Sequence, residues 1–418
     1  MRNRNEQTRS RVRLTAGAAL CLILVCSTHE VWADIPPAIA SEILGNVSDA
    51  PLRDFQLRLL DIALEAASEI PIQPHIKDRS RSQEAVVLAC LELDQPGRAI
   101  RYTDRIDNWR RGSCYADIAF HLARQGDVES AEHCLELAER LSEVAEDWRK
   151  DRVHTKIAKT RAWLGEMEEA RDLEEGVAES EFGKVALAEA MKGDQSSMEE
   201  QISALEPELE SGNFDLVKNA LSVCTKIYTR FYEDPMKRSA VEAKIKSTWS
   251  PMPIFIRIEL LTGMVESALE HSDQETALRL VNETQVLVDE HQWPLEHGLP
   301  IKAKVVELRF RAGDETTARR EADELLRQFE EHKEEIVNIY RAEALHPLAR
   351  AYQAMGETGV ALNVYKRAVE EGVENPNSRP RAEDLSATCC EMARWSIEPD
   401  QELWDRIEEI EQGLDAPW

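Results

Sequence analysis

The sequence is poor in the features that mark β-rich folds and familiar catalytic sites. It has 17 glycines in 418 residues, below the usual share of about 7%, and almost no alternating apolar runs bounded by turn residues. It contains no Cys-x-x-Cys pair and no His-Glu-x-x-His, Gly-x-Ser-x-Gly, phosphate-loop or dinucleotide-binding glycine motif. These absences argue against a strand-rich domain, a zinc or redox centre, and the enzyme classes that such motifs mark.

Basic residues are scarce relative to acidic ones. The chain has 51 Lys and Arg against 79 Asp and Glu, which gives a formal net charge of −28. Such a surface repels phosphate backbones and offers no basic patch to anionic lipids. We therefore predict no nucleic-acid partner, and we interpret the charge as an aid to the solubility of a long exposed surface.

The first 33 residues have the pattern of a signal peptide. Five arginines precede an uncharged stretch of 14 residues, 14–27, and Val31-Trp32-Ala33 offers small side chains at the positions that a signal peptidase reads. We predict cleavage before Asp34 and export to the periplasm or the medium, with no membrane insertion afterwards. The apolar stretch is shorter than the ~20 residues of a spanning helix, but an uncleaved N-terminal anchor stays open as the alternative.

Eight cysteines become six after that cleavage. They lie mostly in apolar, helix-like contexts, and Cys389 and Cys390 are adjacent, so they point to different helix faces. An oxidising compartment would permit disulfides, but the contexts favour buried free thiols.

A turn-and-alanine register repeats along the chain. Five turns have glycine at the centre, usually followed by an acidic residue, and two further turns lack it. The turns are Gln125-Gly126-Asp127, Leu164-Gly165-Glu166, Lys192-Gly193-Asp194, Ala312-Gly313-Asp314, Met355-Gly356-Glu357, His271-Ser272-Asp273 and Leu93-Asp94-Gln95. Five residues after each centre stand Ala131, Ala170, Met198, Ala318, Ala361, Ala277 and Ala99.

This register predicts pairs of helices joined by tight turns. A residue in the left-handed conformation ends the first helix, which glycine does without a Cβ clash. The acidic residue after it suits the start of the next helix, where the free N–H groups favour negative charge. Alanine one turn into that helix lets the two helices approach closely.

Two of these units resemble tetratricopeptide repeats at the family's signature positions. In the unit around Gly126 these positions are Tyr115, Ile118, Ala119, Leu122, Ala131, Leu135 and Ala138. In the unit around Gly356 they are Leu345, Leu348, Ala349, Tyr352, Ala361, Tyr365 and Ala368. The resemblance covers about residues 80–375. It implies an all-α fold, a right-handed α-solenoid of antiparallel helix pairs. Other units depart from the pattern, with Arg161, Glu174, Lys302 and Arg309 at positions that are usually apolar.

The expected organisation follows the repeats and the prolines. After the leader, we expect an N-terminal helical segment or cap at 34–78, repeats at 79–250 and 251–375, and a C-terminal helical cap at 376–418. The 79 residues between the turns at 193 and 272 fit two units, with a degenerate turn at 232–235. Terminal units should be atypical because one face meets solvent. Pro251 and Pro253 mark either a bend between two halves or an ordinary loop.

Candidate chemistry is weak in this sequence. Glu343 and His346 have a Glu-x-x-His spacing, but a di-iron site needs two such motifs and two more carboxylates. The acidic runs near 330–335 and 408–411 lack the glycine turn of a calcium loop. We therefore predict no catalytic residues, no metal site and no cofactor.

If the repeat geometry holds, the first helix of each unit lines a concave groove. Its inward positions would include Phe120, Lys159, Trp163, His346 and Arg350. Basic and aromatic residues there would suit an acidic or C-terminal peptide, whereas the alternative is that they pack against the next unit.

The function expected from these observations is a non-catalytic, exported scaffold that mediates protein–protein interaction. Its partner is a protein or peptide that the sequence does not identify. The alternative is an envelope-associated enzyme or ligand-binding accessory with a pocket in the solenoid, which the fold alone does not exclude.

Overall fold

The computed structural model describes residues 45, 47–193 and 197–418. The expected signal peptide therefore lies outside the described residues, as does Asp194 of one predicted turn. In the described part of the chain the regular structure is entirely helical, as expected. It comprises α2 (Asp54–Glu69), α3 (Ile72–Glu92), α4 (Pro96–Thr103), α5 (Arg110–Gln125), α6 (Val128–Ser142), α7 (Trp148–Leu164), α8 (Met167–Glu174), α9 (Lys184–Lys192), α10 (Met198–Ala204), α11 (Glu206–Glu210), α12 (Phe214–Arg230), α13 (Pro235–Thr248), α14 (Ile254–Glu270), α15 (Gln274–Asp289), α16 (Leu295–Arg311), α17 (Glu315–His332), a short 3₁₀ helix (Lys333–Glu335), α18 (Asn338–Ala354), α19 (Thr358–Val373), α20 (Ser378–Arg394) and α21 (Gln401–Gln412).

The predicted turns fall between helices at every site. Each central residue has a positive φ, from 57° at Ser272 and 58° at Asp94 to 102° at Gly165. The six alanines of the register are fully buried in the helix that follows, and Met198, which replaces the seventh, is 6% exposed. The register therefore located the helix ends correctly, including the two turns that lack glycine.

Aspartate and glutamate act differently after these turns. The side chains of Asp127, Asp273 and Asp314 each accept a hydrogen bond from the backbone N–H three residues on, at 3.1, 3.0 and 3.4 Å. Glu166 and Glu357 occupy the same position without a side-chain cap. The shorter side chain reaches the free N–H groups at the start of the helix, so it contributes a cap as well as a favourable charge.

Two of the polar residues at usually apolar positions of the register have specific partners. Arg161 is 8% exposed and pairs with four glutamates, among them Glu132 at 2.8 Å and Glu166 at 2.9 Å. Arg309 is 5% exposed, and its Nε donates to Glu321 at 3.0 Å. Because a buried charge is tolerated when it is paired and hydrogen-bonded, these units keep their packing despite the polar substitution.

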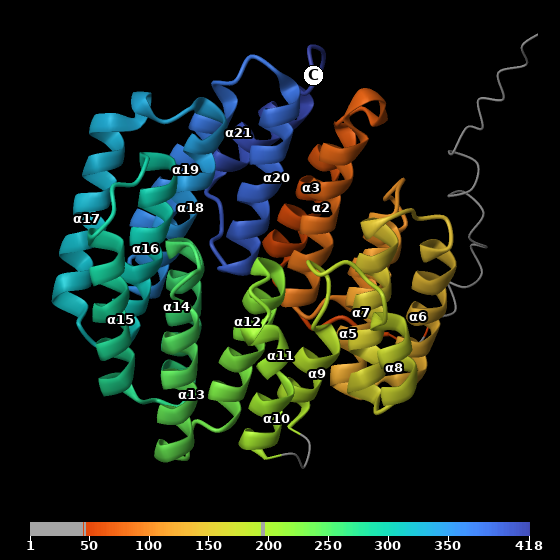
Figure 1. Ribbon diagram of the computed structural model, residues 1–418. Helices are drawn as coiled ribbons and strands as arrows, with labels where there is room; N and C mark the ends of the chain where they lie inside the picture. Colours follow the sequence, from red (N-terminus) through yellow and green to blue (C-terminus); the bar gives the residue numbers. More distant parts are fainter. Residues whose placement is uncertain (1–44, 46, 194–196) are drawn as a thin grey trace, which may run out of the picture.

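Contacts between neighbouring helices continue around the molecule and close on themselves. They run from α2 to α3, α5, α7, α9, α12, α14, α16, α18 and α20, and α20 packs against both α2 and α3. In Figure 1, α20 lies beside α2 and α3, although these helices come from opposite ends of the chain. We call these ten helices the ring. Four other helices lie at the periphery, α15 and α17 at one edge of Figure 1 and α6 and α8 at the other.

The closure uses buried as well as exposed contacts. The amide of Gln56, a residue 6% exposed on α2, donates to the carbonyl of Ala393 at 2.8 Å. The Arg58 guanidinium lies 4.1 Å from the centre of the Trp404 ring on α21. Arg81 on α3 pairs with Glu383 on α20 at 3.0 Å. The terminal segments, which we expected to turn a face to solvent, thus cover one another.

The hydrophobic core is continuous across this closure and divided elsewhere. One cluster of buried residues joins 55–157 to 299–414, a second spans 190–312, and a small third one lies between them at 158–188. Residues on both sides of Pro251 belong to the second cluster, so the core continues through this connection. No helix in the described residues combines the length and apolar character needed to cross a membrane.

Candidate functional site

A cavity lined by both charged and apolar side chains lies between several of the ring helices. It consists of three adjoining hollows of about 610, 760 and 330 Å³, whose walls come from α3, α14, α16, α18 and α20 and from the loops at their ends. All five helices belong to the ring, and in the described part of the chain no other helix contributes a wall residue to these hollows. We call these joined hollows the ring cavity.

Shared residues join the hollows. Tyr340, Glu343 and His346 line the first two, and Glu391 lines all three. On α18 the wall positions 340, 343, 346 and 350 recur every three or four residues, so they occupy one face of that helix. The positions 383, 387, 391 and 394 do the same on α20.

Large apolar side chains are unusually exposed at this wall. Phe255 at the start of α14 is 53% exposed, and on α18 Tyr340 and Ile339 are 41% and 37% exposed. They come from two helices and line the same set of hollows. Contiguous exposed apolar surface beside polar groups is typical of a ligand-binding or protein-binding site.

The arginines of the cavity are neutralised by neighbouring carboxylates. The Nε atom of Arg350 lies 3.6 Å from Glu391, and Arg394 pairs with Glu391 at 3.1 Å and with Glu92 at 2.6 Å. Arg379 pairs in turn with Glu383 at 3.2 Å. Because these arginines already have carboxylate partners, they offer little positive charge to an acidic peptide.

The unpaired charge of the wall is negative. Glu343 on α18 is exposed, and Glu296 at the start of α16 lines the same hollow. Neither of them forms an ion pair with a described residue. The ring cavity therefore favours a cationic group over an anionic one.

Two wall groups, the buried His346 and the partly buried Asp384, are neutral over much of the physiological pH range. Burial lowers the pKa of His346 to about 4, and its Nε2 lies 2.9 Å from the hydroxyl of Thr388. Burial, together with the charges of Glu383 and Glu343, raises the pKa of Asp384 to about 8. Neutral forms cost less to bury than ions, which is why both groups resist ionisation.

The five predicted groove residues separate into two groups. His346 and Arg350 lie together on the wall of the ring cavity. Phe120, Lys159 and Trp163 instead pack against one another between α5 and α7. The rings of Phe120 and Trp163 meet edge to face at 5.7 Å, and the Lys159 ammonium lies 3.7 Å from the centre of the Phe120 ring.

This second group stabilises the contact between α5 and α7. The indole N–H of Trp163 donates to the carbonyl of Ala123 at 3.3 Å. Burial and the charges of nearby cations lower the pKa of Lys159 to about 8, and the Asp117 carboxylate opposes them. Mutual packing of this kind is the alternative that the sequence left open for these three residues.

Other wall residues escaped the sequence reasoning. Arg81 and Arg379 reach the cavity because α3 meets α20, which no local pattern encodes. Tyr340 could have been found, since it continues the spacing of Glu343, His346 and Arg350 by one step toward the start of the helix. Among the described residues, no three His, Cys, Asp or Glu side chains are grouped so as to hold a metal ion. Neither a search of protein-family profiles nor a search of curated proteins finds a match to this chain.

Proposed function

We propose that this protein is a non-catalytic binding module and that the ring cavity holds a short segment of a protein partner. The observation that carries the proposal is the joining of three hollows through Tyr340, Glu343, His346 and Glu391 on two neighbouring ring helices. A continuous path lined by exposed aromatic and charged groups suits an extended peptide, which offers side chains and backbone groups along its length.

The chemistry of the wall specifies the segment. An apolar or aromatic side chain would cover Phe255 and Tyr340, which the protein leaves exposed to solvent. A lysine or arginine would pair with Glu343 or Glu296, since the arginines of the wall already have carboxylate partners. This replaces the acidic peptide that the sequence suggested.

The wider setting is part of the same proposal. The turn register and the signature positions support a tetratricopeptide-like array of antiparallel pairs with a right-handed superhelical path. The basic and apolar leader at 1–33 supports export, so the partner would be a protein of the periplasm or the medium.

A peptide-display experiment with the full chain after the predicted cleavage tests the function. We expect the selected peptides to share a basic residue next to an apolar or aromatic one. Their binding should weaken about tenfold on Glu343→Gln and on Tyr340→Ala, as the loss of one charged or aromatic contact of about 1.4 kcal/mol would produce.

The matched control is Glu275→Gln, which changes an exposed glutamate on the peripheral helix α15. Selected peptides without this composition, or peptides whose binding is unchanged by both cavity substitutions, would show that the ring cavity is not the binding site.

A further inference from the structure

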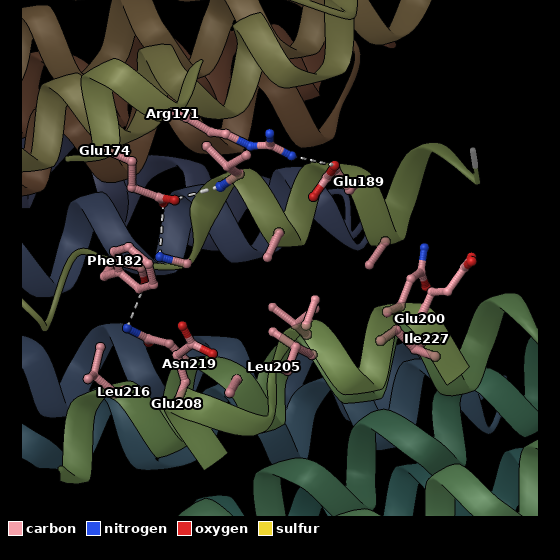
Figure 2. Close-up of a pocket in the computed structure, with 18 of the residues that line it drawn as sticks. Arg171, Glu174, Phe182, Glu189, Glu200, Leu205, Glu208, Leu216, Asn219 and Ile227 are labelled. Atoms are coloured by element: carbon pink, nitrogen blue, oxygen red, sulfur yellow. Dashed lines mark hydrogen bonds and ion pairs between the residues drawn. The ribbon is translucent and has the colours of Figure 1, made fainter. Parts of the chain in front are cut away.

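A second cavity lies where the helices of the array are shortest. It has a volume of about 430 Å³ and is bounded by α8, the residues before α9, and helices α9 to α12. Figure 2 shows its wall residues. We call it the lateral cavity. It shares no wall residue with the ring cavity.

Helix length explains why the space is there. Helix α9 has 9 residues, α10 has 7 and α11 has 5, whereas α7 and α12 on either side have 17 each. Three short helices cannot cover the flank of a long neighbour as a full pair does. The buried core accordingly divides here, between the small cluster at 158–188 and the one that begins at Ala190.

The interior of the cavity is largely apolar. Val185 and Ala190 on α9, Leu205 between α10 and α11, and Val223 and Ile227 on α12 line it. In Figure 2 apolar side chains from three sides face the same space, with carboxylates placed around them. A space of this volume falls in the lower part of the range that binds small molecules, about 300–1,000 Å³.

The polar part of the wall is acidic. Five carboxylates line the cavity against one basic side chain, that of Arg171, in the described wall: Glu174, Glu175, Glu189, Glu200 and Glu208. Arg171 lies 4.0 Å from Glu189, and Oε1 of Glu174 accepts three backbone N–H groups at the start of α9. Glu200 accepts from the backbone N–H of Ser197. Three of the five therefore have structural partners.

Glu208 differs from these three. Its Oε2 atom is shielded from solvent, yet it accepts no hydrogen bond from any described residue. No ion pair with a described residue compensates it either. Leaving such an oxygen without a partner beside an apolar cavity is costly, and a cationic donor in the cavity would remove that cost.

We infer that the lateral cavity binds a small amphiphilic cation, an apolar body that carries one ammonium group, with the ammonium paired to Glu208. The apolar interior takes the body of the ligand, and the excess of carboxylates selects its charge. An anion of the same shape would meet four further carboxylates and a net protein charge of −28. This site is separate from the ring cavity and does not depend on the function proposed for it.

Three probes of one shape test the charge requirement. Octylammonium, 1-octanol and octanoate have the same apolar chain and differ in the charge of the head group. We expect calorimetry with the full chain after the predicted cleavage to show one saturable octylammonium site, with the alcohol at least about tenfold weaker. Octanoate should show no saturable binding. Absence of saturable octylammonium binding, or equal binding of all three probes, would overturn the inference.

Substitutions then locate the site. Glu208→Gln keeps the shape of the side chain and removes its charge, and we expect it to weaken octylammonium binding about tenfold without lowering the thermal stability of the ligand-free protein. Glu210→Gln, an exposed change two residues along the same helix, is the matched control and should bind as the unmodified protein does. Ala186→Leu places three more carbons on the wall and should reduce binding of the same probe.

Each result decides the matter. Equal effects of the two glutamine substitutions would refute the role of Glu208. If Ala186→Leu folds and binds as before, the ligand lies elsewhere; if that variant does not fold, the comparison of Glu208→Gln with Glu210→Gln still decides.

Discussion

Gln56 on α2 provides a direct measure of how strongly the ring is closed. Its amide donates to Ala393 at 2.8 Å, and its Oε1 accepts from the backbone N–H of Arg53 at 3.3 Å. Gln56→Ala removes both bonds, each worth about 1 kcal/mol net, together with about 0.8 kcal/mol from a buried methylene. We therefore expect the free energy of unfolding to fall by about 2–3 kcal/mol.

Urea denaturation measures this loss, and hydrogen exchange shows where it acts. Because α2 and α20 share the contact, we expect the amides at the end of α20 to lose protection along with those of α2. Gln401→Ala is the matched control, since Gln401 is exposed and bonds only to Asp405 on its own helix within the described residues. A cost below about 0.5 kcal/mol, with α20 unaffected, is what an exposed residue at an open end would give. That result would refute the closure.

Two further substitutions test the packing and the electrostatics. Trp163→Ala removes the edge-to-face contact with Phe120 and a hydrogen bond, so it should lower the free energy of unfolding by about 2–3 kcal/mol in urea; a loss below about 0.5 kcal/mol would contradict a packing role. Burial raises the pKa of Asp384 to about 8 from its ordinary 3.8, so the unfolded chain releases this proton at lower pH than the folded protein. The contribution of Asp384 to the free energy of unfolding is therefore complete below pH 3.8 and is lost as the pH rises to about 8. The side chain in Asp384→Asn cannot ionise, so the free energy of unfolding of this variant should rise by about 2 kcal/mol relative to that of the unmodified protein between pH 5 and pH 8.5, after allowance for partial solvent exposure. If the free energies of unfolding of the two proteins changed with pH in parallel, the pKa of Asp384 would be that of an ordinary carboxyl.

The local structure could be predicted from the sequence because its causes are local. A left-handed residue, an acidic residue and an alanine at set spacing determine where one helix ends and how closely the next can approach. These requirements hold within about ten residues, so the turns at Ser272 and Asp94 were found although neither has glycine at its centre. The six described cysteines are free and buried, in agreement with their apolar contexts.

The closure and the ring cavity could not be predicted in the same way. Whether an array of helix pairs stays open or returns on itself depends on small rotations added over the ten helices of the ring, and no single turn encodes their sum. Arg81 and Glu383 are separated by 302 residues, and nothing in either segment identifies the other as its partner. Phe120 and Trp163 pack between the neighbouring helices α5 and α7, whereas His346 and Arg350 lie on the wall of the cavity.

The lateral cavity is an intermediate case. An irregularity in the turn register marks its position in the sequence, but the register alone does not predict a cavity. The turn at Gly193 follows the preceding turn by 28 residues, the shortest interval in the register, and Met198 replaces alanine only in this unit. A short interval leaves room only for a short α9, and a short helix exposes the flank of α12. Methionine fills irregular gaps better than alanine does, and Met198 is buried in the core cluster that begins at Ala190. The break in the register therefore marks the place where short helices leave the flank of α12 uncovered and the lateral cavity forms.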